Sequence, residues 1–249
     1  MFVTTETMAD ACFPGFGSSF TMAFQPIVDA GRREVFAHEA LVRGLSGQGA
    51  AEVLAGVAAS DRFAFHEACR VKAIEMAAAL GMVSRLSLNV LPNDVAGQPQ
   101  CFRTAMAAAE RCNFPVDRLM FEVTEGERVD DMPGLAAVFQ AYRHHGFTSA
   151  IDDFGAAYAS FELLAAFQPD VVKIDMSLVR NIHADPVRLA IVKGFVATCG
   201  DLKIRLVAEG VEVPEEVGAL RSLGVDLFQG YLFAKPAVAA LPAVAWGTA

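Results

Sequence analysis

Residues Leu119–Ile151 read LMFEVTEGERVDDMPGLAAVFQAYRHHGFTSAI, and this stretch decides the fold class. It begins with one short apolar run, Leu119–Val123, and ends with another, Thr148–Ile151. Between the two runs lies a helical pattern over Gly134–His145. Short strands that alternate with helices are typical of parallel sheets. The stretch therefore predicts an α/β fold built on a parallel sheet.

The same alternation continues in both directions along the chain. The remaining apolar runs are Ala23–Val28, Val35–Leu41, Arg85–Val90, Asp170–Ile174, Arg205–Ala208 and Leu227–Phe233. The remaining helical patterns are His66–Leu80, Gln100–Cys112, Pro186–Cys199 and Pro214–Leu223. About eight strands in about 230 residues suit a TIM-type (β/α)8 barrel, which usually has about 250 residues.

The connection between the first two apolar runs departs from this plan. Only six residues, around Asp29-Ala30-Gly31, separate Val28 from Val35. A crossover helix needs a dozen residues or more, whereas a hairpin needs very few. We therefore expect a hairpin here, and one antiparallel strand in an otherwise parallel barrel.

Composition and charge exclude several classes of protein. The chain has 249 residues, 54% of them hydrophobic, and a formal net charge of −9. The apolar content excludes intrinsic disorder. The acidic balance argues against a cationic surface for DNA or for an anionic membrane. No apolar run approaches the roughly 20 residues of a membrane-spanning helix.

The N-terminus and the cysteines indicate a cytoplasmic protein. No Lys or Arg precedes Arg32, so the positive region of a signal peptide is missing. The five cysteines are an odd number without CxxC spacing, and we predict buried, reduced thiols. Residues 1–20 are predicted to be an N-terminal extension or the remnant of a linker, and residues 21–249 the barrel domain. Four histidines are expected at the surface or at helix ends: His66, His144, His145 and His183.

A polar residue stands near the end of almost every apolar strand. These residues are Glu39, Asn89, Glu122, Asp152, Asp153, Lys173, Glu209 and Gln229. In a barrel such positions converge on the C-terminal mouth, where barrel enzymes carry their active sites. Five carboxylates so close together would repel one another or take up protons unless cations neutralised them. Divalent cations with oxygen ligands do this, and two such ions are suited to phosphodiester chemistry. For Asn89 a hydrogen-bonded core amide is the alternative to a ligand role.

Eight ordered motifs give the chain a family resemblance over about residues 21–238. They are Gln25-Pro26-Ile27-Val28-Asp29, Glu39-Ala40-Leu41-Val42-Arg43, Leu88-Asn89-Val90, Glu122-Val123-Thr124-Glu125, Asp152-Asp153-Phe154-Gly155, Lys173-Ile174-Asp175, Ala208-Glu209-Gly210-Val211-Glu212 and Gln229-Gly230-Tyr231. Together they resemble the EAL-domain cyclic-di-GMP phosphodiesterases. The resemblance implies an EAL-type barrel that linearises cyclic di-GMP to a 5′-phosphorylated diguanylate with Mg²⁺ or Mn²⁺, two ions per site.

The resemblance also implies roles for individual residues. Metal ligands would be Glu39, Asn89, Glu122 and Asp152 for one ion, with Asp153 and Glu209 toward the second. Catalytic residues would be Lys173, which holds or deprotonates the attacking water, with Asp153 and Glu209. Substrate contacts would come from Gln25, Leu41, Arg43 and Gln229, with Arg43 on a phosphate. Glu212 would brace the loop after Asp153.

Two departures from the family pattern leave alternatives open. The usual loop Asp-Asp-Phe-Gly-Thr-Gly-Tyr-Ser-Ser here carries Ala156 and Ala157 in place of Thr and Gly. In the family this loop couples metal binding to dimerisation, so a homodimer is expected and the catalytic rate is in question. A weak or inactive domain acting as a cyclic-di-GMP receptor or protein-interaction module is the first alternative. A lysine Schiff-base aldolase using Lys173 is the second.

The segment after Arg43 is shorter than in most of the family. In this respect the chain resembles a subgroup often attached to sensory modules, for which 249 residues leave no room. A sensory or regulatory protein is therefore an expected partner besides cyclic di-GMP.

Overall fold

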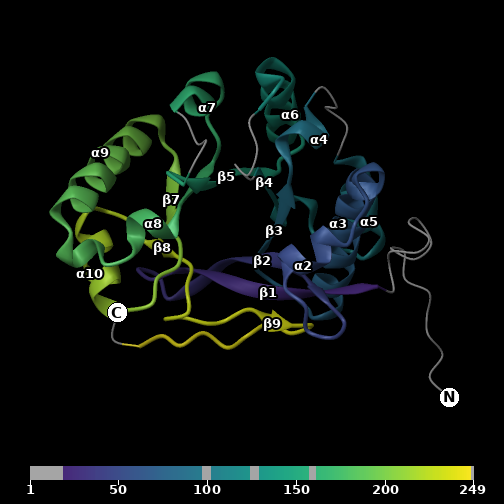
Figure 1. Ribbon diagram of the computed structural model, residues 1–249, viewed down its shortest axis with the longest axis horizontal. Coiled ribbons are helices and arrows are strands. Elements are labelled where there is room, and N and C mark those ends of the chain that lie inside the picture. Colours follow the sequence, from purple (N-terminus) through teal and green to yellow (C-terminus); the bar gives the residue numbers. More distant parts are fainter. Residues whose placement is uncertain (1–18, 97–101, 124–128, 157–160, 248–249) are drawn as a thin grey trace.

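The computed structural model describes residues 19–96, 102–123, 129–156 and 161–247. Its strands are β1 Phe20–Asp29, β2 Glu34–Gly44, β3 Arg85–Val90, β4 Leu119–Val123, β5 Thr148–Phe154, β6 Val171–Ile174, β7 Arg205–Ala208, β8 Leu227–Phe228 and β9 Ala237–Val238. They form one sheet in the order β2-β3-β4-β5-β6-β7-β8-β1-β9, and β1 also pairs with β2 and so closes a barrel (Figure 1). The predicted TIM-type barrel is confirmed.

The helices surround this barrel on its outside. They are α2 Ala50–Ala55, α3 Arg62–Ala79, α4 Pro92–Val95, α5 Arg103–Arg111, α6 Met132–His144, α7 Phe161–Ala166, α8 Met176–Val179, α9 Pro186–Leu202 and α10 Pro214–Ser222. Proline begins α9 and α10, and Asp185 caps α9 by accepting hydrogen bonds from the backbone N–H of Val187 and Arg188. Within the described ranges, no helix combines the length and the apolar content needed to cross a bilayer.

The hairpin at the start of the barrel is also confirmed. Strand β1 runs antiparallel to β2, from Phe20 opposite Gly44 to Asp29 opposite Glu34. It is antiparallel to β8 as well, whereas the pairs from β2 to β8 are parallel. Short strand β9 adds to the outer edge of β1 at Ala23 and Phe24 (Figure 1).

Three predicted strand ends need correction. Strand β2 continues to Gly44 because its pairing with β1 extends that far, so Glu39 lies in mid-strand. Strand β5 includes Asp152 and Asp153, which were expected just after it. Strand β8 ends at Phe228 and not at Phe233, because the backbone from Gln229 onward pairs with Val211 instead.

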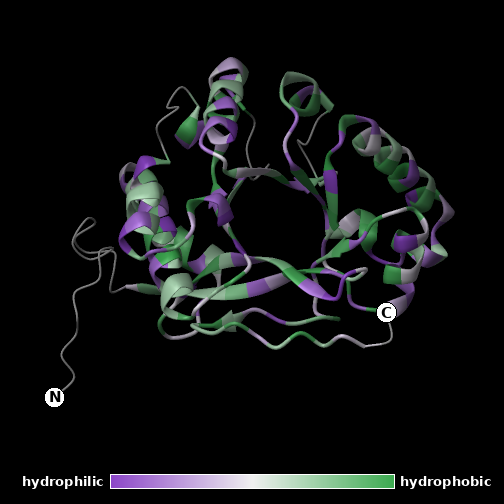
Figure 2. Cartoon of the chain, turned by 180° about the vertical axis from the view of Figure 1, so that it is seen from behind, coloured by the Kyte–Doolittle hydropathy of each residue, from purple (hydrophilic) through white to green (hydrophobic). Residues whose placement is uncertain are grey.

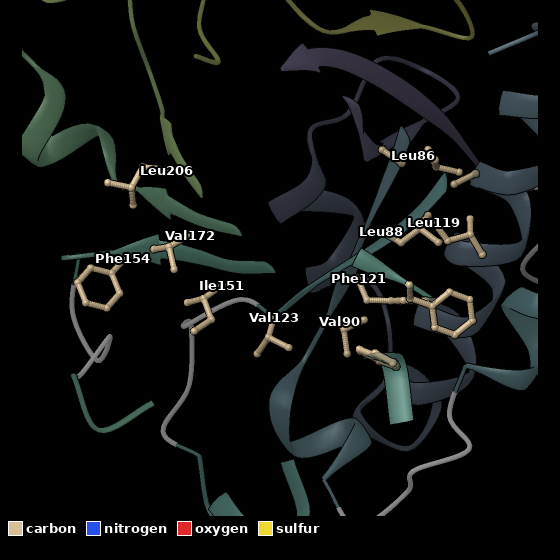
Figure 3. Close-up of a cluster of buried hydrophobic side chains, with 14 of the residues drawn as sticks. Leu86, Leu88, Val90, Leu119, Phe121, Val123, Ile151, Phe154, Val172 and Leu206 are labelled. Atoms are coloured by element: carbon tan, nitrogen blue, oxygen red, sulfur yellow. The ribbon is translucent and has the colours of Figure 1, made fainter. Parts of the chain in front are cut away.

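Two apolar layers hold the barrel together, one outside the sheet and one inside. Alternate residues of β3 and β4, including Leu86, Leu88 and Phe121, point outward and pack beneath the helices (Figure 3). The inner layer lies inside one end of the barrel. It consists of Ile27, Phe36, Ala37, Met120, Ala150, Val171, Val207 and Leu227. The coloured ribbon shows the apolar strands and the mixed polar and apolar helices around them (Figure 2). Because the inner apolar layer fills one end, inward polar side chains gather at the other.

The described cysteines are free thiols. Cys199 is buried as predicted, but Cys69 and Cys112 are only half-buried. Burial raises the pKa of Cys69 and of Cys199 to about 12, so both thiols stay protonated and unreactive at neutral pH. Cys12 and Cys101 lie outside the described residues.

Candidate active site

Lys173 is the centre of the polar layer inside the barrel. It lies on β6 between two outward residues, and its side chain is completely buried. Its Nζ pairs with four carboxylates: Glu122, Glu209 at 2.6 Å, Asp152 at 2.9 Å and Glu39 at 3.4 Å. These acids come from four other strands or strand ends, as the sequence analysis expected. The barrel thus places one ammonium group inside a ring of acids.

Burial and the charges of this cluster shift the pKa values of several of its members. Burial alone would lower the pKa of Lys173, but the surrounding carboxylates outweigh it and raise that pKa well above the usual value. Burial raises the pKa of Glu122 and Glu209 well above the usual range despite the attraction of Lys173. Without metal the cluster therefore holds a charged lysine and favours protonation of some of its acids. A lysine that is charged in the metal-free chain does not suit Schiff-base chemistry, which needs a free amine.

The two adjacent aspartates have different environments. Burial acts to raise the pKa of Asp152, but the charge of Lys173 and its hydrogen bonds lower it overall. Burial and the neighbouring Asp152 charge raise the pKa of Asp153 to about 6. Asp153 also has φ of 54°, in the left-handed region that non-glycine residues seldom adopt. Such strain is concentrated at functional sites, where the fold uses it to direct a side chain.

The acids fit a site for two cations. Ligand oxygens of Glu39, Glu122 and Asp152 lie within 4.8 Å of one another, and so do those of Asp152, Asp153 and Glu209. Asp152 belongs to both groups and could join two ions. The buried Oε1 of Gln229 has no hydrogen-bond partner among the described residues, so it could accept from a water molecule bound to a cation. Hard oxygen ligands of this kind suit Mg²⁺ and Mn²⁺.

Amide side chains complete the polar layer. The Nε2 of Gln229 donates to Glu39 at 2.6 Å and to Gln25 at 3.3 Å, and Gln25 in turn donates to the carbonyl of Ala234. The Nδ2 of Asn89 donates to Glu39 at 3.3 Å and to the carbonyl of Ala40 at 3.4 Å. Asn89 is therefore hydrogen-bonded through Nδ2 to a member of the acid cluster, and Oδ1 is the atom that a cation would contact.

A cavity of about 370 Å³ opens over the cluster. Its lining includes most of the predicted site residues: Gln25, Glu39, Leu41, Asp152, Asp153, Glu209, Glu212 and Gln229. Lys173 and Glu122 lie deeper, and Asn89 lines a separate apolar cavity of about 290 Å³ that shares Glu39 and Leu41. The larger cavity is the place where a substrate could reach the acids.

Gly230 is required for the shape of this cavity. A Cβ atom at Gly230 would lie 2.0 Å from the backbone oxygen of Val211 and 2.4 Å from its nitrogen. The close contact accompanies hydrogen bonds from Val211 N to Gln229 O and from Leu232 N to Val211 O. These bonds hold Gln229 over the cluster.

Two predicted residues make other contacts in this structure. Arg43 is half-buried at the end of β2, and its guanidinium donates to the carbonyl of Val42 at 2.7 Å. Glu212 pairs with Arg180, which lowers the pKa of Glu212. The loop that Glu212 was expected to brace includes Ala157, which lies outside the described residues, as do Thr124 and Glu125.

Three buried residues near the site were missed by the sequence analysis. Ser87 lies two residues before Asn89 on β3 and donates to Glu122 Oε2. Strand alternation could have indicated it, because Ser87 and Asn89 share a face. Glu67 and Arg70 form a buried ion pair on α3 beneath Asn89. His66, expected at the surface or a helix end, is half-buried on the same helix.

Fold and site together define a class of protein, a TIM-type barrel with an acidic metal-binding cluster at its mouth. The family model described as EAL domain matches residues 16–236, and the chain belongs to this family. The family resemblance noted from the motifs is thus confirmed.

Several relatives and solved structures are similar to the chain. The blue light- and temperature-regulated antirepressor BluF of Escherichia coli K12 is 32% identical over 225 residues, which are 90% of this chain and 56% of that protein. The cyclic di-GMP phosphodiesterase PdeR of the same organism is 33% identical over 166 residues, 67% of this chain and 24% of PdeR. The chain thus spans about half or less of these relatives.

Among solved structures, a standalone versatile EAL protein from Vibrio cholerae O395, in its c-di-GMP bound form, is 48% identical with a TM-score of 0.89. The alignment covers 92% of this chain and 98% of that one. Klebsiella pneumoniae BlrP1, in a calcium/cy-diGMP complex, is 37% identical with a TM-score of 0.86, covering 92% of this chain and 58% of that one.

Proposed function

We propose that this chain hydrolyses cyclic di-GMP to the linear 5′-phosphorylated diguanylate in a reaction that needs divalent cations. The observation that carries the proposal is the buried ring of acids around Lys173, open to a cavity of about 370 Å³. The names of relatives such as PdeR, and the c-di-GMP bound form of the Vibrio cholerae protein, support the choice of substrate.

Two Mg²⁺ or Mn²⁺ ions would be held by the acids and by Asn89. One ion would be held by Glu39, Asn89, Glu122 and Asp152, and the second by Asp153 and Glu209. Bound ions supply Lewis-acid activation of water and of the phosphodiester.

The residues of the chain would position the reactants around these ions. Lys173 would hold the attacking water or take its proton. The water oxygen forms the new bond to phosphorus while one ester P–O3′ bond breaks, leaving a 5′-phosphate and a 3′-hydroxyl. Arg43 would turn from its Val42 contact toward the second phosphate, and Gln25, Leu41 and Gln229 would line the substrate cavity.

The test is turnover of cyclic di-GMP by the purified chain with Mn²⁺, followed by chromatography of the nucleotides. The Glu39→Gln variant should be inactive. It removes a carboxylate that belongs to the acid cluster and that accepts a hydrogen bond from Gln229. Cyclic di-GMP left intact by the wild-type chain over hours would overturn the proposal.

A receptor without catalysis is the second candidate. It is favoured by Ala156, which lacks the hydroxyl of the usual loop, and by the name of BluF, an antirepressor. Calorimetry with Ca²⁺ in place of Mg²⁺ measures nucleotide binding apart from turnover. Binding without turnover would establish the receptor, whereas turnover would exclude it.

We further propose that the chain works in the cytoplasm as a homodimer, under a sensory or regulatory protein. The dimer face would be the outer side of α7 and α9, where Phe161, Val187 and Ile191 are 62%, 66% and 51% exposed. Phe161 packs against Phe195 of α9, so the exposed side chains form one patch with Ile191 a turn away. Light scattering of the wild-type chain and of Ile191→Glu tests this dimer face. The wild-type chain should be a dimer and the variant a monomer. A monomeric wild-type chain would exclude the proposed dimer.

A further inference from the structure

Helix α3 contacts the chain at two points, the proposed ligand Asn89 and the turn that follows it. The Nη1 of Arg70 donates to the backbone carbonyl of Asn89 at 3.3 Å. The Nδ1 of His66 lies 2.7 Å from Oδ2 of Asp94, in the short helix α4 that follows β3. His66 and Arg70 are four residues apart and so lie on one face of α3. One helix face thus holds both the end of β3 and the turn beyond it.

A buried ion pair fixes the more important of these contacts. Arg70 and Glu67 are 4% and 5% exposed, and Arg70 Nη2 donates to Glu67 Oε1. Burying two charges costs desolvation energy, and an apolar pair of similar volume is often as stable. The guanidinium, however, offers donors in a rigid fork, so one arm can bond Glu67 while the other bonds Asn89. The pair therefore directs a donor at one particular carbonyl.

We propose that Glu67, Arg70 and His66 position Asn89 for cation binding. This inference rests on the proposed function, in which Asn89 is a ligand. None of the three is itself within the acid groups that could hold an ion. Arg70, held by Glu67, acts on the backbone carbonyl of Asn89, and His66 acts through Asp94 in the turn beyond it. The side chain of Asn89 is in turn joined to the acid cluster, because its Nδ2 donates to Glu39 as well as to the carbonyl of Ala40. Outer partners of this kind orient metal ligands, and their loss weakens metal binding about 10- to 100-fold.

The double variant Glu67→Gln/Arg70→Gln tests this role without leaving an unpaired buried charge. Titration with Mn²⁺, followed by electron paramagnetic resonance of the free ion, measures the dissociation constant directly. We expect about tenfold weaker Mn²⁺ binding, within the range for such residues. The turnover number should return close to the wild-type value at saturating Mn²⁺. A merely structural pair would lower the melting temperature and leave the dissociation constant unchanged.

Arg221→Gln serves as the matched control. Arg221 also pairs with an acid, Asp226 at 3.9 Å, but the pair is exposed on α10. Its variant should bind Mn²⁺ as the wild type does.

The half-buried contact between His66 and Asp94 gives a milder second test. Their side chains are 15% and 23% exposed, so His66→Ala should fold even where the double variant does not. It should weaken Mn²⁺ binding several-fold. If the double variant folds, unchanged Mn²⁺ binding would overturn the positioning role alone. If the double variant does not fold, unchanged Mn²⁺ binding by His66→Ala would do so. A wild-type chain that binds no Mn²⁺ would overturn the proposed function as well.

Discussion

At the scale of single residues, the site depends on one lysine that balances several acids. Lys173 pairs with carboxylates from four other segments. Because Lys173 is fully buried, solvent cannot stabilise these carboxylates in its place. In the proposed reaction the same ammonium or amine faces the attacking water. Its structural role without metal and its catalytic role with metal can therefore be measured separately.

Replacement of Lys173 by Met should abolish most of the turnover and spare nucleotide binding. A positioned proton donor or acceptor contributes about 10²- to 10⁴-fold to a rate, and we expect a loss in that range for Lys173→Met. Binding of cyclic di-GMP with Ca²⁺, measured by calorimetry, should stay within a few-fold. Lys193→Met, at an exposed position of α9, is the control. A variant that turns over at the wild-type rate would remove Lys173 from the mechanism.

Asp153 should make the metal-free protein less stable as the pH rises. Burial and the Asp152 charge raise its pKa to about 6 in the folded chain, above the value of about 3.9 expected when unfolded. Between these values the folded state binds more protons than the unfolded state, so stability falls as pH rises from about 4 to 6. Because the side chain is half-exposed, we expect an effect of only about 1 kcal/mol.

Asp153→Asn, which carries no charge, tests this. In chelator, it should stabilise the protein at pH 7.5 and have little effect at pH 4, as measured by urea unfolding. The same change at both pH values would contradict the raised pKa.

At the scale of helices and strands, a buried glutamate joins α10 to the turn that follows α8. Glu216 is 1% exposed and accepts hydrogen bonds from the backbone N–H of Asn181, of Glu212 at 2.9 Å, and of Val213 at 3.3 Å. Asn181 has φ of 56°, so its unusual backbone is held by this bond. The neighbouring Glu215 is exposed in the same first turn.

Glu216→Ala should therefore lower the free energy of unfolding by about 2–3 kcal/mol, because three part-buried backbone N–H groups lose their hydrogen bonds to a carboxylate. Glu215→Ala should change it by no more than about 0.5 kcal/mol. Urea unfolding of both variants makes the comparison within one helix turn. Equal effects would show that the N-terminal charge of α10, and not the buried contacts of Glu216, provides the stability.

The apolar runs in the sequence determine which strands could be predicted with the right bounds. Strands β3, β4 and β7 have the predicted bounds because apolar runs with clear ends define them. The predicted ends of β2 and β8 were wrong because their pairing partners, β1 and Val211, decide where the strand stops. Glu67 and Arg70 were missed for another reason. A charged pair on a helix ordinarily indicates a solvent-exposed face.

At the scale of the whole molecule, the closed barrel converts separate sequence motifs into one cluster. Each motif places an acid or an amide near the end of a different strand, and only closure of the sheet brings these ends together. Chain order and strand alternation sufficed to predict Glu39, Glu122, Asp152 and Lys173 as neighbours. The Lys173 contacts and the left-handed Asp153 could not be predicted, because they depend on side-chain geometry inside the barrel.

We expect divalent cations held by the acid cluster to raise the stability of the whole molecule. The formal charge is −9, and several of the acids are buried where water cannot screen them. A ligand that binds only the folded state at 100 times its dissociation constant adds about 2.7 kcal/mol. For a domain of this size, that is a rise of about 5–10 °C in melting temperature.

Thermal melts with Mn²⁺ and then with excess chelator measure this rise and its reversal. NaCl at equal ionic strength is the control, because it screens exposed charges but does not enter a buried acid cluster. Glu39→Gln/Asp152→Asn removes one acid of the first group and the acid common to both groups, and should lose the response to Mn²⁺. An equal rise with NaCl alone would mean that general screening, and not a cation held inside the barrel, stabilises the fold.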